Sequence, residues 1–193
     1  MAQKRKPDQT KLAAEAALFL AGKQGWDRLS LAAVAKKAKL PLKTVEASFD
    51  DAWDILAFSL AGLEKQTSAA VDGHLGDNWR DNLMEILMMR FELAQADREA
   101  YAAIGPSALR DPTIVKRFAR EFYHTLDRML QSAGLPKHKC QPAYVAGFGA
   151  VYLSLVDTWL RDKTPDLSKT MAAIDKRIDL LEQAVALMNR QKL

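Results

Sequence analysis

Apolar residues recur three and four positions apart along almost the whole chain, which is the spacing of one buried face of an α-helix. The most regular run follows Thr164-Pro165, where apolar positions alternate four and three apart over three heptads: Leu167, Met171, Ile174, Ile178, Leu181, Val185 and Met188. Such a seam requires a partner helix, which can be an earlier helix of the same chain, a second subunit or both. No segment shows the strict alternation of a strand. We therefore predict an all-α fold with about nine helices.

Three of these helices are predicted within the first fifty residues. The first covers residues 8–21, with Gly22 as its stop signal. Ser30 is a good N-cap for a second helix that ends near Lys37, and a third helix follows at 42–49. Two short helices joined by a tight turn have the spacing of a helix-turn-helix, in which the last helix lies in the major groove of DNA.

The remaining residues are predicted to form a larger helical body. Asp50 or Asp51 caps a helix that reaches about Val71, and a short helix near residues 98–104 ends at Gly105-Pro106. Asp111-Pro112 is an N-cap followed by proline at the first helical position. We therefore predict a DNA-binding head at residues 1–49 and a body at 50–193.

The charge of the chain is concentrated in the head. Residues 1–48 contain ten Lys and Arg against four Asp and Glu, a balance of +6, whereas residues 49–193 have a balance of −2. This is the distribution expected of a polyanion-binding head, although a solvated basic surface has it too. Double-stranded DNA is expected to be contacted by side chains and by the helix start at Ser30. The residues are Ser30, Lys36, Lys37, Lys39, Lys43, Thr44 and Ser48.

A family resemblance rests on residues 13–60. The core Leu29-Ser30-Leu31-Ala32-Ala33-Val34-Ala35-Lys36-Lys37-Ala38-Lys39-Leu40, followed by Phe49-Asp50-Asp51, resembles the N-terminal domain of TetR-family transcriptional regulators. The resemblance implies a TetR-like fold and a homodimer that binds a palindromic operator and responds to a small molecule in the body. Dimer contacts are then expected on the last two long helices, at Tyr144, Val151, Met171, Ile174, Ile178, Leu181 and Val185.

Four positions depart from the family's pattern. Lys39 replaces the turn glycine, Glu46 replaces a tyrosine that usually contacts phosphate, Ser48 replaces a histidine, and Ala52 replaces a lysine. A carboxylate facing phosphate adds repulsion and removes a hydrogen-bond donor. Two interpretations therefore stand: a DNA-binding regulator, or a protein that keeps the fold without operator binding.

A second resemblance lies near the C-terminus, and because bacterial regulators of TetR type share it, it does not by itself separate the two interpretations. Asp157-Thr158-Trp159-Leu160-Arg161-Asp162 and the segment 164–175, which begins Thr164-Pro165, are similar to the C-terminal signature of COQ9-like proteins. That group is related to TetR regulators in fold, and it implies a lipid-binding or accessory role. The residues also fit a plain helix junction, with Trp159 closing the bundle and Asp162 near a helix N-terminus.

The body also contains a candidate pocket for a hydrophobic effector. Methionine and aromatic side chains on helical faces suit an adaptable apolar site, although they also suit an ordinary core. The expected lining is Met84, Met88, Phe91, Tyr101, Phe118, Phe122, Phe148 and Tyr152. Arg90, on the same predicted helix as Phe91, could anchor a polar group of the ligand.

The sequence lacks the usual signatures of catalysis and of metal binding. It contains no phosphate-binding glycine loop, no His-Glu-x-x-His, no Cys-x-x-Cys and no nucleophile elbow, and Cys140 is its single cysteine. No run approaches the roughly 20 apolar residues of a membrane span. We therefore expect no enzyme, no cofactor, no metal site and no membrane span, and we expect the protein to lie in the cytoplasm.

Overall fold

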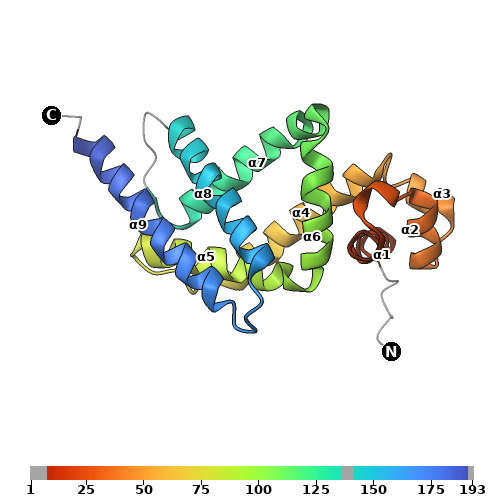
Figure 1. The fold of residues 1–193 in the computed structure, drawn as a ribbon, viewed down its shortest axis with the longest axis horizontal. Coiled ribbons are helices and arrows are strands. Elements are labelled where there is room, and N and C mark those ends of the chain that lie inside the picture. The colour runs from red at the N-terminus through yellow and green to blue at the C-terminus, as the bar shows by residue number, and fades with distance from the viewer. Residues whose placement is uncertain (1–7, 136–140, 191–193) are drawn as a thin grey trace. The chain divides into compact units, whose positions relative to one another are not determined.

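The computed structural model describes residues 8–135 and 141–190, with side chains up to residue 183 in the last helix (Figure 1). This part of the chain contains two 3-10 turns, Trp26–Arg28 and Gln95–Asp97, and no strand. Its α-helices are α1 (Gln9–Gln24), α2 (Leu31–Ala38), α3 (Leu42–Glu46), α4 (Ala52–Val71), α5 (Trp79–Ala94), α6 (Arg98–Leu109), α7 (Pro112–Ser132), α8 (Gln141–Arg161) and α9 (Ser168–Arg190). The predicted all-α fold is confirmed.

The helices form two compact units. Unit 1 consists of Met1–Leu63 and Gln95–Lys116, and unit 2 consists of Glu64–Ala94 and Arg117–Leu193. The predicted head at residues 1–49 lies within unit 1. However, unit 1 also contains the start of α4 and all of α6, so it is built from two separate stretches of the sequence.

The core of unit 1 forms where α2 and α3 pack on an alanine-rich face of α1 (Figure 1). Small side chains on one helix allow neighbouring backbones to approach closely, and larger side chains from the other helices fill the remaining space. The buried residues are Ala13, Ala14, Ala16 and Ala17 from α1, with Val34, Ala35, Val45, Phe49 and Ile55 around them.

The predicted end of α1 at Gly22 is wrong. The helix continues to Gln24 and stops at Gly25, whose φ of 84° lies in the region that favours glycine. Gly22 instead lies inside α1, against α6. A Cβ atom at this position would be 3.1 Å from Cβ of Glu99 and 3.3 Å from the backbone nitrogen of Ala100. The glycine therefore permits close helix packing rather than ending the helix.

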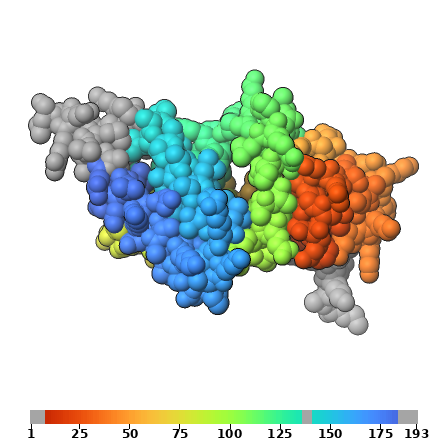
Figure 2. Space-filling model, in the orientation of Figure 1, coloured from red at the N-terminus to blue at the C-terminus, as the bar shows by residue number. Residues whose placement is uncertain are grey.

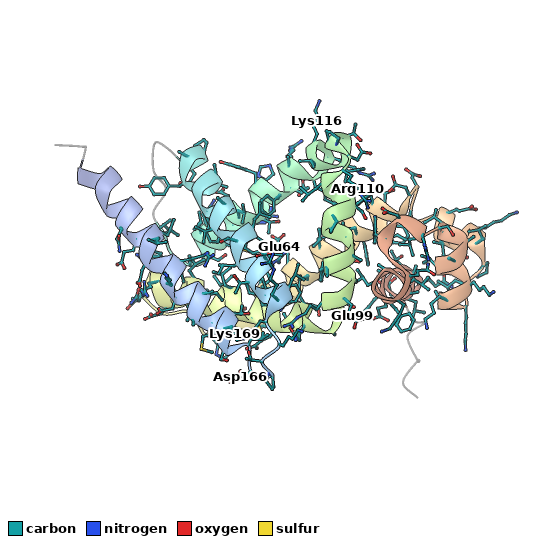
Figure 3. The ribbon with its side chains drawn as sticks, viewed as in Figure 1. Glu64, Glu99, Arg110, Lys116, Asp166 and Lys169 are labelled. Carbon is teal, nitrogen blue, oxygen red and sulfur yellow. The ribbon has the colours of Figure 1, made fainter. Side chains whose placement is uncertain are left out.

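Ion pairs flank the contact of α6 with the head. The Lys23 ammonium lies 3.0 Å from the Glu99 carboxylate, and the Arg110 guanidinium lies 2.5 Å from the Asp27 carboxylate. Figure 3 labels Glu99 and Arg110 at the two ends of α6. Because these pairs are exposed, solvent weakens each of them, and the close packing at Gly22 is the stronger determinant of this contact.

Helix α6 also extends further than predicted. Gly105-Pro106 was expected to end it, but the helix continues to Leu109. Proline removes one backbone hydrogen bond and crowds the preceding turn, which disfavours a helix interior. Here Ile104 and Ser107 are buried on either side of the proline, so packing of this last turn outweighs the local preference.

In unit 2, α9 lies along α8 and α5, and Figure 2 shows α8 and α9 side by side on the near face. Ile174, Ile178 and Leu181 of the heptad seam are buried within the chain, as is Tyr144 of α8. The same chain thus supplies the partners of this part of the seam. Within the predicted dimer interface, Val151 is half-buried and Met171 is 45% exposed, while the side chain of Val185 lies outside the described residues.

The junction between α8 and α9 is organised around Asp162, which is 1% exposed. Its carboxylate accepts hydrogen bonds from the backbone N–H and the hydroxyl of Thr164, at 2.9 and 2.5 Å, and from the same two groups of Thr170, both at 2.8 Å. Burial alone would raise the pKa of Asp162, but these hydrogen bonds outweigh burial and hold the pKa well below its ordinary value. The segment therefore works as a helix junction, as its sequence suggested.

The neighbouring residues complete this junction. Asp166 accepts a hydrogen bond from the backbone N–H of Ser168 at 3.1 Å, and Figure 3 labels Asp166 in the loop that leads into α9. Trp159 is buried, and its ring centroid lies 5.5 Å from that of Phe91. The aromatic residue of the C-terminal motif is therefore part of the core of unit 2.

Within the described ranges, α8 alone is long and apolar enough by composition to cross a membrane, with a mean hydropathy of 1.3 in its most apolar window. The expectation that the chain has no membrane span stays a prediction. Core helices can have the same length and composition, and α8 buries a face that carries Tyr144, Phe148, Leu155 and Trp159.

Candidate nucleic-acid interface

The candidate interface begins with the cap of α2. The Ser30 hydroxyl accepts a hydrogen bond from the backbone N–H of Ala33 at 3.2 Å, which confirms the predicted N-cap. Ser30 itself is exposed. Its hydroxyl therefore has a structural role at the same helix start where backbone N–H groups would meet a phosphate.

The turn between α2 and α3 depends on Lys39. This residue has a φ of 57°, and its backbone N–H bonds to the carbonyl of Lys36, while that of Leu40 bonds to the carbonyl of Ala35. These two bonds form a Schellman motif, whose turn position favours glycine. The lysine thus occupies a strained backbone position and presents an exposed ammonium group at the turn.

This strain leads to a testable prediction. Replacing Lys39 by glycine should raise the free energy of unfolding by about 1 kcal/mol, because glycine has no Cβ to strain the left-handed conformation. Urea unfolding measures the change. Lys36→Gly is the matched control, since it lies in the helical part of α2 and should lower stability by about 1 kcal/mol. A Lys39→Gly variant less stable than the parent chain would contradict the strained turn.

Helix α3 is held by two apolar side chains. It covers only Leu42–Glu46 rather than the predicted 42–49, and Val45 and Phe49 are buried in the core of unit 1. After Glu46 the chain forms a turn in which the backbone N–H groups of Ser48 and Phe49 both bond to the carbonyl of Val45. Anchoring at Val45 leaves Lys43 and Glu46, three residues apart, exposed on the outer face.

The residues predicted to contact DNA differ in their exposure to solvent and in their neighbours. Lys36, Lys37, Lys39, Lys43 and Ser48 are exposed, and Thr44 is partly buried. The Lys37 ammonium lies 3.6 Å from the ring centroid of Phe19, an exposed residue of α1. This cation–π contact holds Lys37 against α1. The role of Phe19 could not be predicted from the sequence, because the contact joins two helices.

The acidic residues after α3 have a structural role. The Asp51 carboxylate accepts a hydrogen bond from the backbone N–H of Asp54 at 2.9 Å, and the Asp54 carboxylate accepts one from that of Asp51 at 3.4 Å. These reciprocal bonds form a capping box at the start of α4. The carboxylates of Asp51 and Asp54 are therefore engaged with the backbone at the start of α4.

A second candidate site lies in unit 2, where Tyr152 is surrounded by aromatic rings. The ring centroids of Phe122, Phe91 and Phe148 lie 5.9, 6.1 and 6.4 Å from that of Tyr152. The structure therefore brings together four of the eight predicted lining residues. Met88 is buried as well, and Met84 and Phe118 are partly buried. Tyr101 lies on α6, in unit 1.

The site around Tyr152 also contains charge. Glu64 accepts hydrogen bonds from Nε and Nη2 of Arg128 and from the Thr125 hydroxyl, the last at 2.9 Å. Burial alone would raise the pKa of Glu64, but these bonds and the positive charges of Arg128 and Arg90 lower it below its ordinary value. Glu64 is therefore ionised at neutral pH.

Comparison with solved structures shows which fold this arrangement represents. The TetR transcriptional regulator from Nitrosomonas europaea superposes with a TM-score of 0.78 over 90% of this chain and 98% of its own, at 13% sequence identity. The TetR fold is shared by this chain. A TetR transcriptional regulator from Rhodococcus sp. RHA1 gives a TM-score of 0.58 at 16% identity, over 90% of this chain and 94% of its own.

Sequence comparison adds no closer assignment. No family model matches the chain, and no curated protein matches it. The likeness to the TetR fold therefore rests on the arrangement of the helices rather than on sequence identity. The resemblance of residues 157–175 to COQ9-like proteins stays a prediction.

Proposed function

We propose that this protein is a transcriptional regulator that binds double-stranded DNA as a homodimer, with unit 1 as its DNA-binding head and unit 2 as the site of a hydrophobic effector. The TetR fold supports the general assignment. The observation that carries the proposal is the α2–α3 turn, where Lys36, Lys39 and Lys43 are exposed around a strained backbone position. The proposal places the protein in the cytoplasm with its DNA, and it assigns no catalytic reaction and no cofactor.

The dimer requires a surface other than the buried part of the α9 seam. Leu153 of α8 is 57% exposed, and Met171 and Leu180 of α9 are 45% and 55% exposed. Exposed apolar side chains on adjacent helices are suited to pairing with a second copy. A homodimer would present two heads, which matches a palindromic operator.

The proposal is tested by titrating the protein against its own promoter DNA at two salt concentrations. We expect salt-sensitive binding with two chains per operator, and we expect Lys43→Ala to weaken binding about fivefold to tenfold through loss of one phosphate contact. Lys11→Ala, an exposed lysine of α1, removes the same charge elsewhere in the head and should change affinity by less than twofold. Binding no tighter than to random duplex would overturn the proposal.

A second candidate function is supported by one observation, the exposed Glu46 carboxylate on the outer face of α3. Repulsion between this group and phosphate favours a COQ9-like protein that binds lipids and has lost operator binding. Lipids that copurify with a protein showing no preference for its promoter would support this alternative.

A further inference from the structure

Arg90 of α5 lies in the interior of unit 2 with an incomplete set of partners. The residue is 5% exposed, and its Nε donates a hydrogen bond to the Tyr152 hydroxyl at 2.8 Å. Its Nη1 is buried and has no hydrogen-bond partner. An arginine carries its charge at all physiological pH values and can only donate hydrogen bonds. The interior of unit 2 therefore contains a buried cationic donor without an acceptor.

The neighbouring carboxylate does not supply the missing acceptor. Glu64 is engaged by two nitrogens of Arg128 and by the Thr125 hydroxyl. The positive charge of Arg90 still acts on Glu64 through space, which places both groups in one electrostatic environment. Arg128 also has the carboxylates of Glu121 and Asp127 near it, whereas no hydrogen bond joins Arg90 to Glu64 among the described residues.

Arg80, on the same helix as Arg90, also has a buried Nη1 without a hydrogen bond, but carboxylates lie within 4 Å of that nitrogen. Arg80 pairs with three carboxylates of α9, those of Asp175, Asp179 and Glu182. Arg90 instead has aromatic surroundings, with Phe91, Phe122 and Phe148 grouped around its partner Tyr152. A buried charge that is left unpaired in apolar surroundings is strongly disfavoured, so an acceptor from outside the chain would stabilise it.

We propose that unit 2 binds an amphipathic carboxylate, an acid with an apolar chain or ring, whose carboxylate accepts a hydrogen bond from Arg90 Nη1. The Tyr152 hydroxyl holds the guanidinium in place, and the aromatic cluster contacts the apolar part of the ligand. Guanidinium groups recognise carboxylates through charge-assisted hydrogen bonds. This inference rests on the proposed effector site and names the chemistry of its ligand.

The test compares acids with alcohols of the same skeleton. Isothermal titration calorimetry of the full chain without DNA uses decanoate against 1-decanol and 4-phenylbutanoate against 4-phenylbutanol. We expect at least one acid to bind tenfold or more tightly than its alcohol, and Arg90→Met to remove that preference. Equal binding of acid and alcohol in both pairs, or a preference that survives in Arg90→Met, would overturn the inference.

A matched substitution on the same helix shows whether Arg90 is merely structural. Without ligand, Arg90→Met should raise the Tm by about 3 °C, because it removes an unpaired buried charge. Arg80→Met should lower the Tm through loss of its ion pairs and leave the acid preference intact. A fall in the Tm of Arg90→Met comparable to that of Arg80→Met would identify Arg90 as structural and overturn the inference.

The two proposals fail separately. Operator binding without any preference for acids removes this inference and leaves the regulator assignment in place. A preference for acids in a protein that does not bind its promoter supports the inference and removes the regulator assignment.

Discussion

Replacing Asp162 by alanine is expected to lower the free energy of unfolding by about 3 to 4 kcal/mol. The substitution leaves two backbone N–H groups and two hydroxyls, those of Thr164 and Thr170, without the carboxylate they share. Thr170 is buried in the first turn of α9, so water cannot readily replace the lost acceptor. Urea unfolding followed by circular dichroism measures the loss.

The same carboxylate makes this stability depend on pH. The pKa of Asp162 is depressed in the folded chain, so its contribution is fully present above the ordinary aspartate value of about 3.9 and is lost as the pH falls below it. The difference between the parent chain and Asp162→Ala should therefore shrink between about pH 5 and pH 2.

A matched control comes from the same region. Asp157→Ala removes a carboxylate that forms an exposed pair with Arg161 one turn away on α8, at 2.8 Å, and it should cost less than about 0.5 kcal/mol. Equal losses for the two variants would show that Asp162 does not organise the junction.

Replacing Glu46 by lysine is expected to increase affinity for promoter DNA by about tenfold or more at low salt. The substitution removes a carboxylate from the exposed face that α3 shares with Lys43, and it adds a cation there. One new phosphate contact should steepen the slope of log affinity against log salt by about 0.9. Fluorescence anisotropy with labelled operator at several salt concentrations measures both quantities.

The control for this prediction is Glu15→Lys. Glu15 is an exposed residue of α1 near Lys11, and its replacement makes the same change in net charge away from α3. An equal gain in affinity for both variants would mean that net charge alone governs binding. It would also mean that α3 is not the surface that meets the duplex.

Local chemistry predicted much of the fold. The N-caps at Ser30 and Asp111 depend on residues within three positions of one another, and both occur as expected: the Asp111 carboxylate accepts a hydrogen bond from the backbone N–H of Thr113 at 2.9 Å. The break at Gly73 is another local feature, because its φ of 77° suits glycine. Signals of this kind are visible in sequence because they need no distant partner.

The errors arose where distant packing decides the structure. Glycine is a common signal for the end of a helix, but Gly22 is packed against α6, more than seventy residues further along the chain. Pro106 is similar, since burial of its neighbours keeps the helix intact. The α9 seam was recognised correctly as a packing surface, but its sequence could not show that α5 and α8 of the same chain supply the partners.

In the candidate sites, too, features that depend on nearby residues could be predicted, whereas features that depend on distant packing could not. The basic residues around the α2–α3 turn were apparent from charge and spacing, whereas the engagement of Lys37 by Phe19 needed the structure. The grouping of Phe91, Phe122 and Phe148 around Tyr152 follows from helical periodicity only once the helices are placed. Arg90 was a candidate anchor from its position on α5, but its missing acceptor is a property of the folded interior.

The close contact at Gly22 also limits how the head can be isolated. Because α6 covers this part of α1, a fragment that stops after α3 would expose to solvent an apolar surface that the intact protein buries. Extending the fragment to include α6 also brings in residues 64–94, which belong to unit 2. No continuous truncation therefore reproduces unit 1 alone, and footprinting or spectroscopic work on the head requires the intact polypeptide or a designed linker that joins α4 directly to α6.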